Sequence, residues 1–400
     1  MKEEKDQTSF AVLALFVIYN NCITDESLSP TSGIKSILSD IAEECELSTL
    51  LNIKVVRSHL EFFRHSYVKK IGSSYMIMHD KLFDIFVSFY GEHFLDIILT
   101  HCSYPVIYTR FQLHHVHSVE DTDEYMIKVP LEKEAEYFQR LFHVSKAEDY
   151  AYIFSHNHFK CRIFQQKFLT FLSEDQDCRD LCLSLSETES SPLFITAARG
   201  YTDMIKVLLD IGMNVNVSDD FELTPLSYAA GGGCFETVKL LLENNGDMNK
   251  QTKNKPILNF TLAAFQLYSV YYKATFVPID DESYKTFTEI VERLPRMDKK
   301  DGDLRRIPCS GTPLFLATIF GHTDIVKLLS KQNCDIYLHD WFNISPLYIA
   351  TLCNHVDIVA IMLEHGCDIN TCNEGHESPL FKASERGACS YGEIIVRQQL

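Results

Sequence analysis

The chain has 400 residues, 46% hydrophobic and 23% charged, a globular composition that excludes wholesale disorder. This length predicts two or three domains. With 37 basic and 55 acidic residues, the net charge of −18 makes general binding to polyanions unfavourable. The 13 cysteines show no paired spacing such as C-x-x-C. We therefore expect free thiols in a cytoplasmic protein.

The apolar run from Ala11 to Tyr19 lies close to the N-terminus. A membrane-spanning helix needs about 20 apolar residues, and this run is shorter. The preceding MKEEKD is net negative, and no small-residue cleavage site follows. We therefore expect a buried helix in a soluble intracellular protein that makes no membrane contact.

Three helices followed by a β-hairpin are predicted in the first 80 residues. The helices are expected at 9–22, 32–45 and 52–65, from their apolar stripes. Strands are expected at 67–71 and 75–78, joined by a Gly-Ser-Ser turn, and a long helix at 80–95. This order predicts a winged-helix domain at about 1–100.

The tripeptide Met78-His79-Asp80 stands where the second strand passes into the long helix. It resembles the MHD motif that ends the winged-helix domain of STAND-class signalling NTPases, which include the NACHT and plant-resistance families. The surrounding YMIMHDKLFDIFVSFYG is similar to animal members of that class, and the resemblance covers about 8–100. It implies that His79 contacts the β-phosphate of ADP when an NTPase domain is present.

No GxxxxGK[ST] phosphate-binding loop occurs in this chain. The STAND resemblance therefore implies an NTPase domain upstream, or a protein that has lost it. In the alternative interpretation, His79 and Asp80 are simply residues at a helix start.

A cluster of basic residues lies in the third helix and the hairpin. It has a local charge of +4 once Glu61 is counted, and consists of Lys54, Arg57, Arg64, Lys69 and Lys70. Because winged helices often bind DNA through this helix, a DNA-associated regulator is our alternative function. The total charge weighs against DNA, and the adjacent Phe62 and Phe63 indicate burial on two sides of the helix. The other interpretation is a solvated helix face, or a face that docks on an absent NTPase domain.

Residues 101–190 are predicted to be a helical connector. We expect a strand at 125–129, helices at 131–142 and 159–171, and a serine-rich linker at 184–191. Since a repeat array cannot leave its first apolar face uncovered, this connector should cap it.

A tripeptide of Ser or Thr, Pro and Leu recurs at intervals of 33 residues. Its prolines are Pro192, Pro225, Pro313, Pro346 and Pro379. The hydroxyl residue is suited to a helix N-cap and the proline to the first helical position. Only Gly or Asn occurs nine residues after each cap. The same is true 12 residues further on, where the pattern continues. Gly and Asn are the residues expected where a helix ends in the left-handed conformation.

This pattern of two short helices and a turn closely resembles the ankyrin repeat over about 191–400. Apolar residues at i, i+3 and i+4 in each second helix agree with it. The interval from Pro225 to Pro313 is 88 residues. We expect it to hold a degenerate third unit, with Lys255-Pro256-Ile257 in place of the tripeptide and an insertion at 268–283, in an array of about six units.

Residues of metal-ligating types occur at His114, His115, His117, His156, His158 and Cys161. Their spacing matches no common zinc site, so we expect surface histidines. The chain also lacks GxSxG, HExxH and a GxGxxG after a strand. We therefore expect no catalytic residue, metal or cofactor.

We call the loop that joins two successive units a fingertip. The fingertip between the fourth and fifth units carries Trp341, the only tryptophan, next to Phe342. Solvated turns usually carry small polar residues, and aromatic side chains are enriched at binding hot spots. We expect a protein-binding surface here and on the neighbouring concave face, unless these aromatics pack under the insertion. Its other members are Ile344, Leu352, Cys353, Ile319, Phe320, Asp220 and Phe221.

The sequence thus predicts a mainly α protein: a winged-helix domain, a helical connector at 101–190 and an ankyrin solenoid at 191–400. The expected function is non-enzymatic protein recognition at the end of an intracellular STAND-type signalling or innate-immune receptor.

Overall fold

The computed structural model describes residues 2–29, 33–48, 50–64, 66–114, 125–143, 157–185, 191–219, 222–251, 312–339, 343–373 and 375–381. The chain forms two compact units. Unit 1 comprises Met1–Lys146 and His158–Phe171, and unit 2 comprises Ala147–Asn157 and Leu172–Leu400. The division into three domains stays a prediction.

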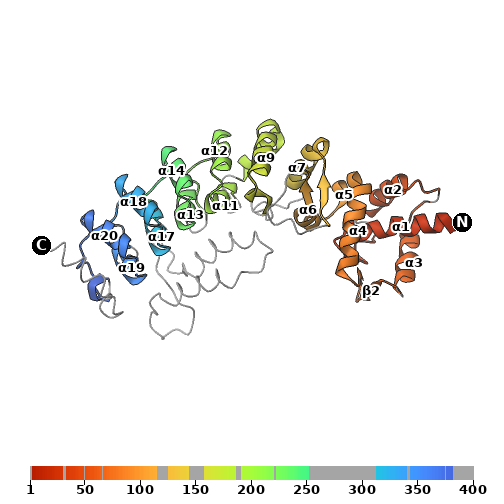
Figure 1. Ribbon diagram of the computed structural model, residues 1–400, viewed down its shortest axis with the longest axis horizontal. Coiled ribbons are helices and arrows are strands. Elements are labelled where there is room, and N and C mark those ends of the chain that lie inside the picture. The colour runs from red at the N-terminus through yellow and green to blue at the C-terminus, as the bar shows by residue number, and fades with distance from the viewer. Residues whose placement is uncertain are drawn as a thin grey trace. The chain divides into compact units, whose positions relative to one another are not determined.

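Unit 1 begins with the three helices expected from the apolar stripes (Figure 1). They are α1 (Lys2–Ile18), α2 (Ile34–Glu44) and α3 (Ile53–Phe63). Helix α3 begins where the sequence predicts, because the side chain of Asn52 accepts hydrogen bonds from the backbone N–H groups of Lys54 and Val55. Helix α1 starts earlier and ends earlier than expected, so its buried part, 11–18, forms the last two turns.

The expected hairpin is confirmed as β2 (Val68–Ile71) and β3 (Ser74–Ile77). Ile71 pairs with Ser74, which leaves a two-residue turn, and Gly72 in this turn has φ +60°. A short strand that the sequence did not predict, β1 (Ile23–Thr24), pairs with the other edge of β3. The resulting sheet has the order β1-β3-β2 and is antiparallel.

Unit 1 continues with helices around a two-stranded parallel sheet. Its elements are α4 (Asp80–His93), α5 (Leu95–His101), α6 (Tyr104–Arg110), β4 (Phe111–Leu113), β5 (Ile127–Val129), η1 (Leu131–Lys133) and α7 (Glu134–His143). After η3 (Asn157–Lys160), helix α9 (Arg162–Glu174) adds Phe164 and Phe168 to an aromatic cluster around Phe138. The expected strand and helices of the connector are confirmed within a few residues.

Unit 2 contains helix α10 (Gln176–Ser184) and a row of paired helices (Figure 1). One layer holds α11 (Pro192–Ala198), α13 (Pro225–Gly231), α17 (Pro313–Ile319) and α19 (Pro346–Leu352). The other holds α12 (Thr202–Asp210), α14 (Phe235–Glu243), α18 (Thr323–Lys331) and α20 (Val356–Glu364).

The predicted starts and ends of these helices are confirmed. Each helix of the first layer begins with its proline, and the side chains of Thr224, Thr312 and Ser345 accept the expected cap hydrogen bonds. The predicted Gly and Asn stops in the described residues all have positive φ, from 60° to 104°. They are Gly200, Gly212, Gly233, Asn245, Gly321, Asn333, Asn354 and Gly366.

The expectation of a third unit stacked between the second and fourth repeats is wrong. Helix α13 packs directly on α17, and α14 on α18. The backbone N–H of Asp335 donates to Asn249 Oδ1 across this junction at 2.9 Å, just as Asp247 donates to Asn216 across the preceding one at 2.7 Å. These contacts leave no room for another helix pair, and 252–311 lie outside the described residues.

Among the described helices, none combines the length and apolar composition needed to cross a bilayer.

Candidate protein-binding surface

The helices of the first layer do not present the exposed concave surface that the sequence analysis expected. Every residue of α11, α17 and α19 is buried. Ile319 and Leu352, which we expected to face a partner, belong to this buried set. Cys353, expected at the same surface, follows α19 and is buried as well. The physical reason is that segments such as PLFLATI carry apolar side chains around almost the whole helix, and such a helix is buried all round. Its polar member, Thr318, is buried with its hydroxyl donating to the backbone oxygen of Leu314 at 2.7 Å.

Ile344, in the loop before α19, is also buried, so its assignment to the binding surface is wrong as well. Phe320 is half-buried, and its ring lies against His322 with 6.2 Å between ring centroids. The remaining residues of the predicted surface lie outside the described part of the chain: Trp341, Phe342, Asp220 and Phe221.

The chain immediately after Trp341 and Phe342 is held to the next repeat. Asn343, with φ +56°, donates from Nδ2 to the backbone oxygen of Cys372 at 2.6 Å. In the same region Tyr348 donates its hydroxyl to Glu377 at 2.7 Å, and Asn373 also donates to this carboxylate at 3.2 Å. These contacts join Asn343 and Tyr348 to the repeat that follows them.

A ladder of side chains crosses the junctions between repeats, and the sequence analysis missed it. Cys234 and His322 each follow a Gly stop, and His355 follows the Asn stop at Asn354. Cys234 Sγ donates to the backbone oxygen of Ala198 at 3.4 Å, and His322 Nε2 to that of Gly231 at 3.0 Å. His355 Nε2 donates to Ile319 in the same way at 3.0 Å. Their shared position after the stop is the signal that would have revealed them.

The glycines of these stops have a second role besides their positive φ. A Cβ added to Gly233 would lie 2.6 Å from the imidazole of His322, and one added to Gly321 would lie 2.7 Å from that of His355. Each loop glycine therefore makes the space into which the next repeat places its histidine.

Burial lowers the pKa of His322, and His355 lowers it further, against the hydrogen bond to Gly231 that raises it. As the pH falls, His322 is therefore protonated in the unfolded chain at a higher pH than in the folded chain. The stability that His322 contributes is present above the ordinary pKa of 6.5 and is lost as pH falls through the lower folded pKa. We expect the urea midpoint to fall between pH 7.5 and pH 5, and to fall less in His322→Cys, which copies Cys234. An equal or steeper fall in the variant would contradict this role.

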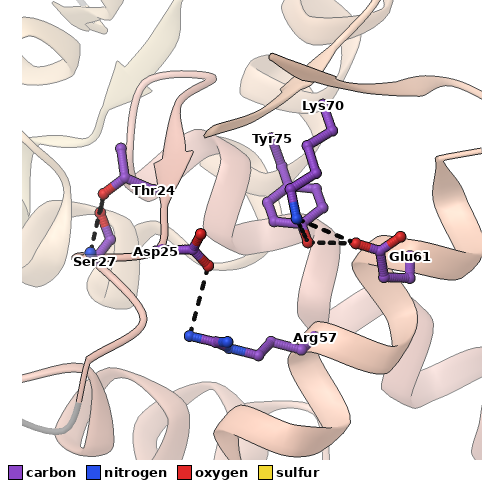
Figure 2. Close-up of polar contacts among 7 residues, drawn as sticks. All are labelled: Thr24, Asp25, Ser27, Arg57, Glu61, Lys70 and Tyr75. Carbon is purple, nitrogen blue, oxygen red and sulfur yellow. Dashed lines mark hydrogen bonds and ion pairs between the residues drawn. The ribbon is translucent and has the colours of Figure 1, made fainter. Parts of the chain in front are cut away.

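Three of the five residues in the basic cluster of unit 1 lie close to an acidic side chain, two of them Arg57 and Lys70 (Figure 2). Glu61 accepts hydrogen bonds from the Tyr75 hydroxyl at 2.6 Å and from Lys70 Nζ at 3.4 Å, and Lys70 also donates to Tyr75 at 2.7 Å. Arg57 lies 3.6 Å from Asp25. The hydrogen bond from Tyr75, and then the contacts with Lys70, lower the pKa of Glu61. The third helix thus places a fixed negative charge in the middle of its basic residues.

His79 is exposed at the start of α4 and makes no capping hydrogen bond. Of the residues with metal-ligating types, His114 is exposed, His158 and Cys161 are half-buried, and His115, His117 and His156 lie outside the described residues. In the described part of the chain, no three His, Cys, Asp or Glu side chains come together in a way that would hold a metal ion.

Comparison with known families identifies the repeats. The family model for ankyrin repeats matches residues 160–252, 283–373 and 314–396, together just over half of the chain. The chain belongs to the ankyrin-repeat family. The first match begins before α11 and takes in α9 and α10, so the ankyrin pattern starts earlier than the expected residue 191.

Among curated proteins, the chain is similar to protein phosphatase 1 regulatory subunit 12A of Mus musculus and of Rattus norvegicus. Each is 37% identical over 70 residues, which is 18% of this ankyrin-repeat chain. The chain covers only 7% of the length of these relatives.

Proposed function

We propose that this ankyrin-repeat protein is a non-enzymatic recognition module that binds a protein partner through the fingertips of its array. The observation that carries this proposal is the array itself, whose first-layer helices are largely buried and whose loops between repeats differ in sequence. The similarity to a phosphatase regulatory subunit, named for regulation rather than catalysis, agrees with it.

The proposed centre of the binding site is Trp341 with Phe342, beside the anchor of Asn343 on Cys372. We expect Trp341→Ala with Phe342→Ala to weaken partner binding at least tenfold, about 1.4 kcal/mol or more, because aromatic anchors dominate interface energies. The partner is first captured from cell extract on the immobilised chain and purified. Its affinity for each variant is then measured by calorimetry, and unfolding of each variant by urea titration. If the double variant instead loses folding stability, these two side chains are core residues and the proposed site is wrong.

We further propose that the module is the sensing end of a cytoplasmic STAND-type signalling or innate-immune receptor. Two features of unit 1 support this. The order α1-β1-α2-α3-β2-β3 is that of a winged helix, and Met78-His79-Asp80 stands between β3 and α4, as in the MHD motif. The exposure of His79 is compatible with a contact to a nucleotide held by a separate NTPase domain.

By itself, this chain should not bind ADP in the micromolar range. Phosphate recognition in that class relies on a glycine-rich loop, which the sequence lacks. A single hydrogen bond from His79, worth about 1.5–3 kcal/mol, corresponds to a Kd of about 10 mM or weaker. Calorimetry with ADP and Mg²⁺ on residues 1–400 tests this, and micromolar binding would show a phosphate site that the non-enzymatic proposal omits.

The alternative, a DNA-associated regulator, rests on the basic cluster of α3 and the hairpin. Glu61 weighs against it, because its carboxylate lies among these cations and repels phosphate. A gel shift with random duplex at low salt separates the two proposals, since DNA binding would produce a complex that dissociates as salt rises.

A further inference from the structure

Helix α4 of unit 1 carries an apolar stripe on its outer side. The inner side of the helix is buried through Phe83, Val87 and Tyr90. Four further apolar residues lie at i, i+3, i+4 and i+7 and therefore share one face of the helix: Leu82, Ile85, Phe86 and Phe89. Ile85 is 48% exposed and Phe89 is 39% exposed, and the other two are half-buried. A surface helix normally carries polar side chains on this side. We call these four residues the outer stripe.

The ring of Phe89 is held in place on this surface. It stacks on the imidazole of His93, with 4.3 Å between ring centroids and an angle of 15° between the ring planes. His93 is fixed in turn, because its Nδ1 donates to the backbone oxygen of Phe89 at 2.9 Å. Phe10 of α1 also contacts Phe89, edge to face, at 5.5 Å. An aromatic ring that is already ordered loses less conformational entropy when a partner binds it.

Two charged residues lie along one edge of the outer stripe, the edge next to Ile85. Lys81 and Glu92 are 11 residues apart, about three turns of the helix, so they share this edge near opposite ends of α4. Both are exposed, and neither forms an ion pair within the part of the chain that the structure describes. Asp84, by contrast, lies 2.9 Å from Arg110. The edge therefore offers one positive and one negative charge to a partner.

The positions of Lys81 and Glu92 oppose the dipole of their own helix. The N-terminal end of a helix favours negative side chains and the C-terminal end favours positive ones. Lys81 stands in the first turn of α4 and Glu92 in the last, so each charge is at its unfavourable end. An antiparallel partner helix would bring its negative end to Lys81 and its positive end to Glu92. Residues that break a local rule in this way often have a function.

We propose that the outer stripe is a self-association site, which packs antiparallel on the outer stripe of a second copy of the chain. A two-fold axis relates the same edge of two antiparallel helices, so that each contact occurs twice. Lys81 of one copy then meets Glu92 of the other, while Ile85 and Phe89 pack between them. In a parallel pair, Lys81 would meet Lys81. This site lies outside the array of repeats and goes beyond the function proposed above.

Sedimentation velocity of the full chain over a range of concentrations tests the proposal. We expect the mass to rise from that of a monomer towards twice that value. Ile85→Ser with Phe89→Ser should weaken the association at least tenfold, because it removes the exposed apolar side chains of the stripe. The matched control is Phe62→Ser, which removes a 62% exposed aromatic side chain of the same unit and should leave the association unchanged. Far-UV circular dichroism checks that each variant is folded.

Exchange of the two charges tests the antiparallel arrangement without touching the apolar residues. Lys81→Glu alone and Glu92→Lys alone should each associate at least tenfold more weakly, because both contacts between the copies then join like charges. An equal mixture of these two variants should associate again, since each contact then joins opposite charges. Both substitutions agree with the helix dipole, so α4 should remain folded. Association of the natural chain should weaken as salt rises.

Two results would overturn the proposal. One is a chain that stays monomeric at the highest soluble concentration. In that case, a different protein that the immobilised chain retains by way of Ile85 and Phe89 would be the occupant of the stripe. The other is an association that the serine variant leaves intact, or that the mixture of charge variants fails to restore. Trp341→Ala with Phe342→Ala should not affect self-association, so failure of this site is distinguishable from failure of the fingertip site.

Discussion

Phe315→Ala should lower the free energy of unfolding by about 3–5 kcal/mol, the usual cost of truncating a fully buried aromatic side chain. Phe315 is 0% exposed in α17, and α17 packs between α13 on one side and α19 on the other. The cavity would therefore open inside the stack. Because a folded domain has a total stability of about 5–15 kcal/mol, the loss is a large fraction of it. Urea unfolding, followed by far-UV circular dichroism and by the fluorescence of Trp341, measures the effect.

Phe381 supplies the matched control, since it occupies the same place in its repeat. Its backbone N–H donates to Ser378 Oγ at 3.1 Å, as that of Phe315 donates to Thr312 Oγ1 at 3.2 Å, so the local structure is alike. Phe381 is nevertheless 55% exposed. Phe381→Ala should therefore cost less than about 1 kcal/mol. Equal losses for the two variants would mean that burial in the stack does not decide the cost.

Gly91→Ala should destabilise unit 1, although alanine is the better helix former. In an open helix this change would add about 0.5–1 kcal/mol of stability. A Cβ on Gly91, however, would lie 2.3 Å from Cγ1 of Ile127, a buried residue of β5. Overpacking of this kind costs about 1–3 kcal/mol, occasionally more, so we expect a net loss. The change in urea midpoint of the full chain gives the sign directly.

The cause can be isolated in the background of Ile127→Ala, which removes the clashing branches. There Gly91→Ala should be neutral or stabilising, and the coupling between the two positions gives the energy of the clash. A stabilising effect of Gly91→Ala in the natural background would show that β5 moves away at no cost. A destabilising effect that persists without the Ile127 side chain would show that the helix itself requires glycine.

The local structure of the repeats was determined by the sequence itself. A proline at the first position and a Gly or Asn at a left-handed stop act through their own φ angles and their own N–H groups. For that reason the helix starts at Pro225 and Pro346, and the stops at Asn333 and Asn354, agree with the expectation. The hairpin turn at Gly72 is local in the same sense.

The binding residues were less predictable, because the same apolar side chain suits a core and an interface equally well. Ile319, Ile344 and Leu352 have the composition of a recognition surface, yet they are buried. Whether such a side chain is exposed depends on which segments cover it, and the spacing of residues along the chain carries no information about that.

The tertiary structure alone decided how the repeats join. The 88-residue interval from Pro225 to Pro313 is long enough for a further unit, and its composition does not exclude one. The contacts of His322 with Gly231 and of Asp335 with Asn249 show that the two flanking repeats meet directly. The physical reason is that stacking is set by complementary surfaces of residues far apart in the chain, whereas helix ends are set by the conformational preferences of single residues.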